Sequence, residues 1–171
     1  MRYFACIVCF FFSFTVFSQK WFQLGQDIDG ENQADHSGYS VSLSSDGTIV
    51  AIGAPNNSAG QVRVYRWNGT WTQMGEDIDG EAVGDWSGEF LSISDNGYTI
   101  AIGAQNNDGN GANAGSVRVY NWSGASWNQV GSDIDGAVAG DRSGIVSLSG
   151  NGNVVAIGSP EYSNSRGHVR I

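Results

Sequence analysis

The sequence predicts an all-β protein built from repeated four-stranded antiparallel meanders. Three observations predict this class: similar units recur about every 50 residues, short alternating or apolar runs fill each unit, and glycine-containing dipeptides separate the runs. Glycine is abundant, with 25 residues, whereas proline is scarce, with 2. No run after residue 18 shows the periodicity of an amphipathic helix.

The first eighteen residues, MRYFACIVCFFFSFTVFS, predict a cleavable signal peptide. An apolar run follows Arg2, and it is shorter than the roughly 20 residues that a membrane-spanning helix needs. We therefore expect residues 1–18 to be removed and the mature protein to be secreted or displayed at the cell surface, with no membrane span. Cys6 and Cys9 both lie in this leader, so we expect no disulfides after export, a pattern more typical of bacteria.

The charge balance excludes some partners. The chain has 17 acidic and 8 basic residues and a net formal charge of −9. Nucleic acids require basic patches, so they are not expected partners. The sequence also lacks a Ser-His-Asp arrangement, a zinc-ligand spacing and a phosphate-binding loop, and we therefore expect no enzymatic activity.

The mature sequence divides into three similar units, each beginning at or just before a tryptophan. The predicted units are residues 19–70, 71–126 and 127–171. The third unit ends in HVRI, which aligns with QVRV inside the first unit, so it is predicted to be truncated.

Four strands are predicted for each unit. In the first they are SVSLS (40–44), TIVAIGA (48–54), QVRVYRW (61–67) and WTQMG (71–75), the last of which opens the next unit. Asp46-Gly47 and Asn68-Gly69 separate strands and are typical of tight hairpins, because they tolerate positive φ.

One such meander exposes both faces, so it must pack against its neighbours. Four-stranded sheets at this spacing are typical of β-propeller blades, with a β-solenoid or a sandwich as alternatives. Propellers close with about 4 to 8 blades. Three units therefore predict about three blades of a propeller that is unlikely to close alone, in a fragment of a longer protein or an incomplete gene model.

The stretch SGYSVSLSSDGTIVAIGAPNNSAGQVRVYRW resembles the FG-GAP repeat, the blade unit of integrin alpha-chain propellers. The matching features are Ser37-Gly38, Asp46-Gly47, Gly53-Ala54-Pro55 and Gly60. The resemblance implies a propeller that acts in extracellular recognition and adhesion. It also implies calcium loops in the first hairpin of some blades.

Those hairpins depart from the family's calcium loop. The first three ligand positions hold Ser42, Ser44 and Asp46 in the first unit, and the other units have no carboxylate there. Calcium prefers several carboxylates among its six to eight oxygen ligands. We therefore expect Asp46, Asn96 and Asn151 to be ordinary turn residues.

The acidic segments DIDGENQAD and DIDGEAVGD are the remaining candidates for calcium, the only cofactor that the sequence suggests. Their candidate ligands are Asp27, Asp29, Glu31, Asp35, Asp77, Asp79, Glu81 and Asp85. The third copy, DIDGAVAGD, has Ala137 at the glutamate position. The favoured interpretation is a polar connector between blades, with Asx turns, with Asp-Gly pairs such as Asp29-Gly30 as turn formers, and with Ile28 and its equivalents plugging the gap between blades.

Two sets of recurring side chains are predicted to belong to the scaffold. Arg63, Arg118 and Arg170 recur on the third strand and are expected to pair with connector aspartates of a neighbouring blade, or to stack on tryptophan. Trp67, Trp71, Trp122 and Trp127 are expected to pack across strands, with stacking on sugars as the alternative.

The sequence thus predicts an exported module for extracellular recognition or cell adhesion, without catalysis, whose partner is an extracellular protein or glycan. One alternative is a non-catalytic propeller region of a larger secreted enzyme, such as a carbohydrate-active one. Another is a purely structural surface protein.

Overall fold

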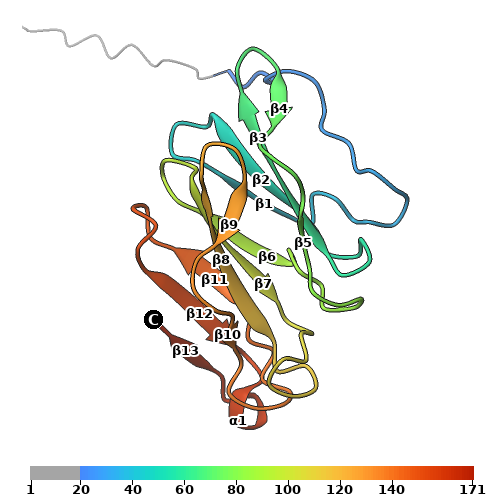
Figure 1. Ribbon diagram of the computed structural model, residues 1–171, viewed down its shortest axis with the longest axis vertical. Helices are drawn as coiled ribbons and strands as arrows, with labels where there is room; N and C mark the ends of the chain where they lie inside the picture. Colours follow the sequence, from blue (N-terminus) through green and yellow to red (C-terminus); the bar gives the residue numbers. More distant parts are fainter. Residues whose placement is uncertain (1–19) are drawn as a thin grey trace, which may run out of the picture.

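A computed structural model describes residues 20–171 as three antiparallel β-sheets that follow one another along the chain (Figure 1). The predicted signal peptide, residues 1–18, lies outside the described residues together with both cysteines, so it stays a prediction. No helix among residues 20–171 is long and apolar enough to cross a membrane.

The strands match the predicted meanders. Sheet 1 contains β1 (Ser40–Leu43), β2 (Ile49–Ala54), β3 (Gln61–Trp67), β4 (Trp71–Gln73) and β5 (Ile78–Asp79). Sheet 2 contains β6 (Phe90–Ile93), β7 (Thr99–Ala104), β8 (Ser116–Trp122), β9 (Trp127–Gln129) and β10 (Ile134–Asp135). Sheet 3 contains β11 (Ile145–Leu148), β12 (Val155–Ser159) and β13 (His168–Arg170).

The first hairpin of each sheet confirms the predicted turn chemistry. The backbone N–H groups of Thr48, Tyr98 and Asn153 donate to the side chains of Asp46, Asn96 and Asn151, at 3.0, 2.9 and 3.1 Å. The following glycines, Gly47, Gly97 and Gly152, have φ between 70° and 75°. A short side-chain acceptor and a residue with positive φ are what such a turn needs.

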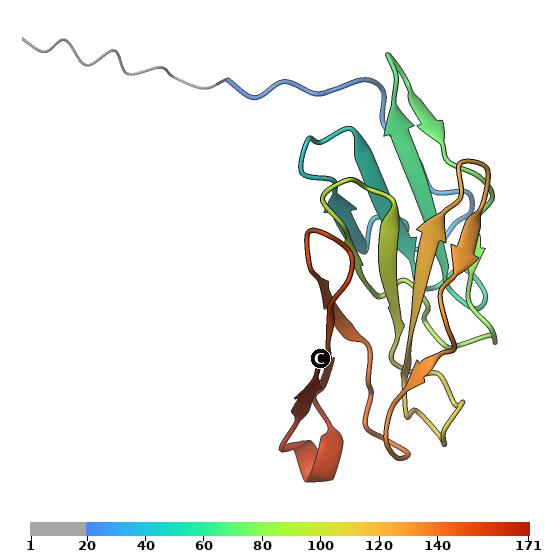
Figure 2. The ribbon, with the colours of Figure 1, turned by 60° about the vertical axis from the view of Figure 1, so that its left-hand side comes forward.

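The sheets stack face to face in chain order (Figure 2). We call the face that carries Val41, Leu91 or Val146 the front face of its sheet, and the opposite face the back face. The largest core lies between the back face of sheet 1 and the front face of sheet 2. Its buried members are Ile49, Ala51, Val62, Val64, Met74, Ile78, Ile93, Ile100, Ile102 and Tyr120. A smaller core, with Ala101, Val117 and Ile157 buried, joins sheets 2 and 3.

The segment before sheet 1 lies where the outer strand of a preceding sheet would lie. The Trp71 indole N–H donates to the Leu24 carbonyl at 2.8 Å, as the Trp127 indole donates to the Met74 carbonyl, also at 2.8 Å. Residues 24 and 74 are equivalent in the repeat. The first segment thus contacts sheet 1 as the residue that follows β4 contacts sheet 2.

The acidic segments differ from the predicted connectors in one respect. Ile78 and Asp79 form β5, which pairs with Val62 and Gln61 at the start of β3. The strand β4 pairs with the end of β3, along the same edge of the sheet. Ile134 and Asp135 form the equivalent β10 on β8. The outer strand is therefore interrupted and then resumes before the chain crosses to the next sheet. Ile78 is 5% exposed and joins the core between sheets 1 and 2, as the predicted plug requires.

The chain between β12 and β13 contains one short helical turn, α1 (Tyr162–Ser165). Ser163, Asn164 and Ser165 have φ between 52° and 62°, so the turn is left-handed. The described residues therefore contain no regular right-handed helix, which agrees with the absence of helical periodicity in the sequence.

Candidate recognition surface

A recurring arginine ties each sheet to the segment that precedes it. The Arg63, Arg118 and Arg170 guanidinium groups donate to the backbone carbonyls of Asp29, Asp79 and Asp135, at 2.8, 2.8 and 2.6 Å. Each guanidinium also donates to a serine hydroxyl of its own unit: Ser37, Ser87 or Ser143. The scaffold role was predicted, but the partner differs, because the backbone carbonyl of the connector aspartate accepts the bond in place of its carboxylate.

The predicted stacking of these arginines on tryptophan is also different in detail. Arg63 lies 5.8 Å from the ring centre of Tyr65, and Arg118 lies 5.7 Å from that of Tyr120. The tryptophans pack on each other across the outer hairpins, as predicted. The ring centres are 5.3 Å apart in the pair Trp67–Trp71 and in the pair Trp122–Trp127.

The last aspartate of each acidic segment is buried and closes a turn. The carboxylate of Asp35 accepts the Asn32 backbone N–H at 2.9 Å, and that of Asp85 accepts the Ala82 N–H at 3.1 Å. Asp141 is 1% exposed and accepts two backbone N–H groups, each at 2.9 Å. A carboxylate can be buried when backbone donors satisfy it. The role is structural, but the geometry differs from the predicted Asx turn. Each carboxylate accepts N–H groups of residues three or four positions earlier, whereas an Asx turn uses the N–H two positions later.

The other candidate calcium ligands are bonded to protein groups, and two of them are brought together: the Asn107 amide donates both to Glu81 and, at 2.9 Å, to Asp85. The Asp27 carboxylate accepts from Gln23 at 2.7 Å, and Glu81 accepts from the Asn107 side chain at 3.0 Å. Asp29 and Asp79 contribute the carbonyls described above. Among residues 20–171, no three His, Cys, Asp or Glu side chains lie close enough together to hold a metal ion.

Glu31 and Asp77 are brought together, but from different units. Both accept from the Gln61 amide, at 3.3 Å and 2.6 Å. Glu31 also lies 3.9 Å from the Arg63 guanidinium. Gln73 donates to the second oxygen of Asp77 at 2.6 Å. The chemistry of this cluster is an amide-bridged contact between successive segments.

The glycine of each DIDG motif has a different role from the predicted one. Gly30, Gly80 and Gly136 are not among the residues with positive φ. A Cβ at Gly80 would lie 2.1 Å from the Ala59 carbonyl oxygen, and one at Gly136 would lie 1.9 Å from that of Ala114. These two glycines permit close backbone approach, and do not form the tight turn that was expected.

One position per unit combines exposure with an unusual backbone. His36, Trp86 and Arg142 occupy the same place, between the buried aspartate and the Ser-Gly pair, with φ of 55°, 60° and 50°. All three side chains are exposed. Positive φ is uncommon for residues other than glycine and costs of order 1 kcal/mol or more. The sequence shows that these positions vary between units, but the strained backbone becomes visible only in the structure.

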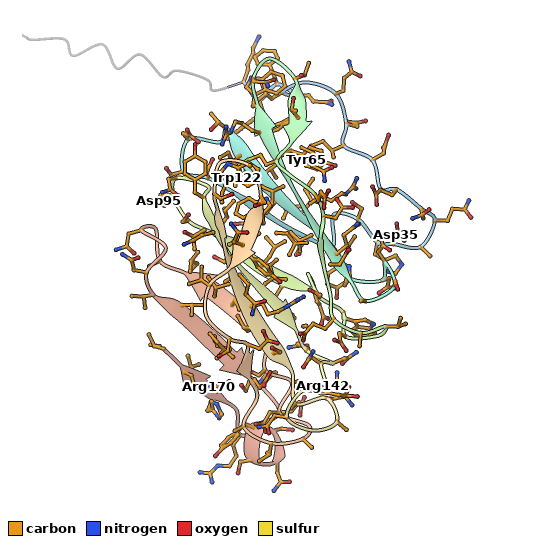
Figure 3. All side chains as sticks on the ribbon, viewed as in Figure 1. Asp35, Tyr65, Asp95, Trp122, Arg142 and Arg170 are labelled. Atoms are coloured by element: carbon orange, nitrogen blue, oxygen red, sulfur yellow. The ribbon has the colours of Figure 1, made fainter. Side chains whose placement is uncertain are left out.

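These three residues lie on one side of the molecule, which we call the connector rim: residues 31–39, 81–89 and 137–145 with the loops 55–60, 105–115 and 160–167. The loops are bonded to the connectors. For example, the Gly84 N–H donates to the Ser58 carbonyl at 3.2 Å, and the Arg142 N–H donates to the Asn113 carbonyl at 3.1 Å. Figure 3 shows Asp35 and Arg142 on this side and Asp95, in a first hairpin, on the other.

Glu89, also on the connector rim, has a carboxyl group whose burial disfavours its charged form. One carboxylate oxygen of Glu89 is buried without a hydrogen-bond partner. Burial raises the pKa of the Glu89 carboxyl, and the Arg142 charge lowers it in part. A perturbed carboxyl beside an exposed cation is typical of binding surfaces.

Comparison with known proteins supports the fold. The sequence matches no protein-family model and none of the curated proteins. Hydrazine synthase of Kuenenia stuttgartiensis is similar in structure, with a TM-score of 0.51 and 17% identity over 75% of this chain and 32% of that chain. A protein of Bacteroides fragilis described as a 6-phosphogluconolactonase gives a TM-score of 0.47 and 15% identity, over 76% of this chain and 36% of that chain.

This chain spans about a third of the length of those two structures. The similarity at the higher TM-score shows that the three antiparallel sheets match part of a β-propeller, which confirms the predicted fold class. At this level of identity the similarity concerns the fold alone.

Proposed function

We propose that the chain is a non-catalytic, exported recognition module that binds an extracellular protein or glycan through the connector rim. The observation that carries this proposal is the contrast within the DxSG motif. Its aspartate, serine and glycine are the same in all three units, whereas the exposed residue between them is His36, Trp86 or Arg142.

The fixed residues of this motif have structural partners. The aspartate accepts backbone N–H groups, and the serine accepts from the arginine that ties the sheet to the preceding segment. The variable residue has a strained backbone, so the fold would be served at least as well by glycine. An imidazole, an indole and a guanidinium present three kinds of contact on a rigid frame, and exposed aromatic and arginine side chains are enriched in binding sites.

The resemblance to FG-GAP repeats supports the same proposal, because that family acts in recognition and adhesion. A non-catalytic part of a larger secreted enzyme would use the same rim to hold its substrate. The recognition module and the enzyme region differ only in the domains that accompany the propeller. The experiment below therefore tests binding by the connector rim, which both share.

The proposal is tested with the triple variant H36G/W86G/R142G, in which glycine suits the positive φ at all three positions. The labelled mature chain is applied to an array of immobilised glycans and to fibronectin, collagen and mucin surfaces. We expect at least one surface to bind the natural chain and the triple variant to lose at least about tenfold in affinity. The matched control Q26A/E76A/S132A changes one exposed residue per unit outside the rim. Equal binding by the natural chain and the triple variant would contradict the proposal.

A further inference from the structure

A cleft outside the connector rim lies where sheets 1 and 2 meet. One wall is the chain between β4 and β5, residues 75–79, and the other is formed by Tyr120 of β8 and the β8–β9 hairpin, residues 125–127. Its volume is about 450 Å³. Small-molecule sites have volumes of roughly 300–1,000 Å³ and combine aromatic walls with a few polar groups. The cleft has the size of such a site, and each wall belongs to a sheet of five strands.

Two aromatic side chains line the cleft. Tyr120 is 8% exposed, and Trp127 is partly buried. The Trp127 indole N–H donates to the Met74 carbonyl at 2.8 Å, and the ring packs on Trp122. The indole is therefore fixed in place and offers a ligand its ring surface, without a free hydrogen-bond donor. The faces of aromatic rings attract cations, and tryptophan does so most strongly.

The cleft is also lined by carboxylates and by no basic side chain. The three acidic residues are Glu76, Asp77 and Asp79. Asp77 accepts from the Gln73 and Gln61 amides, both at 2.6 Å, and these donors are uncharged. Within residues 20–171, no hydrogen bond or ion pair joins the carboxylate of Glu76 or Asp79 to another group. The cleft therefore has an excess of negative charge, which attracts cations and repels anions.

The fold already places cations against tyrosine rings. The Arg66 guanidinium lies 5.4 Å from the ring centre of Tyr98, and that of Arg118 lies 5.7 Å from the ring centre of Tyr120. Arg118 does not line the cleft, because its guanidinium is bonded to the Asp79 carbonyl. Next to the three carboxylates this single cation leaves a net negative charge.

An equivalent cleft with fewer charges lies between the first segment and sheet 1. Its volume is about 360 Å³, and Asp27, Tyr65 and Trp71 line it at the positions of Asp77, Tyr120 and Trp127. Gln26 stands at the position of Glu76, and Asp27 is the one carboxylate among the lining residues. The aromatic pair thus recurs in both clefts, whereas the strong negative charge belongs to the cleft between sheets 1 and 2.

We propose that the cleft between sheets 1 and 2 binds an organic ammonium group. The ammonium group lies against the Trp127 and Tyr120 rings, and the three carboxylates supply the opposite charge. These carboxylates are too far apart to hold a metal ion together, so they suit a cation as large as a substituted ammonium. The site is separate from the connector rim, and the inference does not depend on the function proposed above.

The test is a titration of the mature chain with choline at low ionic strength, followed by tryptophan fluorescence and by calorimetry. We expect saturable binding with a Kd of about 1 mM or lower. Dimethylbutanol is the uncharged analogue of choline in which carbon replaces the nitrogen. It should bind at least about tenfold more weakly, because neither the ring faces nor the carboxylates attract it by charge.

Glu76→Gln is the variant that addresses the cleft, because it removes one charge and keeps the size of the side chain. Glu76 is exposed, so circular dichroism should show unchanged folding. We expect the affinity for choline to fall at least about threefold. Glu161→Gln is the matched control, because it removes an equal charge from an exposed position outside the cleft, and it should leave the affinity unchanged.

Four results would overturn the proposal. The first is an absence of saturation up to about 50 mM choline. The second is equal affinity for dimethylbutanol, which would identify an apolar pocket. The third is an equal effect of Glu76→Gln and Glu161→Gln, which would show that only the charge of the whole chain attracts choline. The fourth is tighter binding of glucose than of choline, which would assign the cleft to carbohydrate.

The cleft and the connector rim can also be separated by experiment. The control for the connector rim, Q26A/E76A/S132A, removes Glu76. It should therefore weaken choline binding while binding by the rim is kept. Retention of full choline affinity by this variant would contradict the proposed cleft without affecting the rim.

Discussion

The contact between sheets 1 and 2 and the contact between sheets 2 and 3 use the same repeat positions but differ in depth. In the first, ten hydrophobic residues are buried together. In the second, only Ala101, Val117 and Ile157 are buried, and the partly exposed Val146, Leu148 and Val155 surround them. Sheet 3 has three strands, whereas sheets 1 and 2 have five each, so fewer side chains close the second contact. We infer that a sheet of this repeat gains stability from being covered on both faces, which among the described sheets holds only for sheet 2.

Truncation of a core residue should break the first contact more severely than the second. We expect Ile102→Ala to lower the free energy of unfolding by about 3–5 kcal/mol and Ile157→Ala by about 2–3 kcal/mol, because the surroundings of Ile157 can collapse or hydrate more easily. Urea denaturation of both variants measures this. Equal losses would mean that the two contacts are equally well packed.

The glycines of the DIDG motifs also differ between the first segment and the segment between sheets 1 and 2. In Gly80→Ala the added Cβ meets the Ala59 carbonyl oxygen at 2.1 Å, whereas in Gly30→Ala the nearest atom is the Ser37 Cβ at 3.1 Å. We expect a loss of about 1–3 kcal/mol for Gly80→Ala and less than about 1 kcal/mol for Gly30→Ala. Thermal unfolding compares the two variants, and a larger loss at Gly30 would contradict the close-approach role.

The arginine that ties successive sheets should matter more than an arginine at a hairpin. Arg118→Met leaves the Asp79 carbonyl and the Ser87 hydroxyl without their donor, and we expect a loss of about 1–2 kcal/mol. Arg66→Met removes only a contact with the Tyr98 side chain and should cost about 0.5 kcal/mol. Denaturant titrations of both variants provide the measurement. Similar small losses of unfolding free energy would contradict the role of Arg118 in holding successive sheets together.

The smallest expected effects concern pH. Burial raises the pKa of Glu89 above its ordinary value of 4.5, so this carboxyl contributes stability below that pH which is lost as the pH rises through the folded-state pKa. Glu89→Gln should remove this fall and raise Tm by about 1–2 °C at neutral pH. If Glu89→Gln and the natural chain have the same Tm from pH 4 to 8, burial does not destabilise the charged carboxyl.

The pKa of Asp46 is shifted in the opposite direction to that of Glu89. Hydrogen bonds from Ser44 and Thr48 lower the pKa of this carboxyl below 3.8. Its contribution is therefore present above that pH and is lost as the pH falls through the folded-state pKa. Asp46→Asn, which copies the residue of the other two units, should flatten the acid limb of the stability curve. The change in slope between pH 4 and 2 is measured by thermal unfolding.

Much of the fold could be predicted from the sequence because each unit repeats the same local signals. Strand alternation and the Asp-Gly and Asn-Gly turns act over a few residues, so β1, β2 and β3 and their hairpins could be placed in advance. The return of the outer strand as β5 could not be predicted, because it depends on pairing with residues of β3 that precede it by about 17 positions. A two-residue strand has no periodicity of its own.

The candidate site could be predicted less well. The acidic spacing suggested calcium, but in the structure Asp35 accepts a backbone N–H and Glu31 and Asp77 share the Gln61 amide, and the sequence does not reveal these partners. The positions of His36, Trp86 and Arg142 were visible as the variable residue of a fixed motif. Their positive φ was not, because neither tryptophan nor arginine favours a left-handed backbone, and histidine is only enriched there and does not require it.

Amide hydrogen exchange along the strands tests most directly the claim that coverage on both faces stabilises a sheet. The claim predicts slowest exchange for the strand amides of β7 and β8, which lie in the doubly covered sheet 2, and clearly faster exchange for β1 and β13. Equal protection of β1 and β6 would contradict it, because these equivalent inner strands differ in whether a sheet covers their front face.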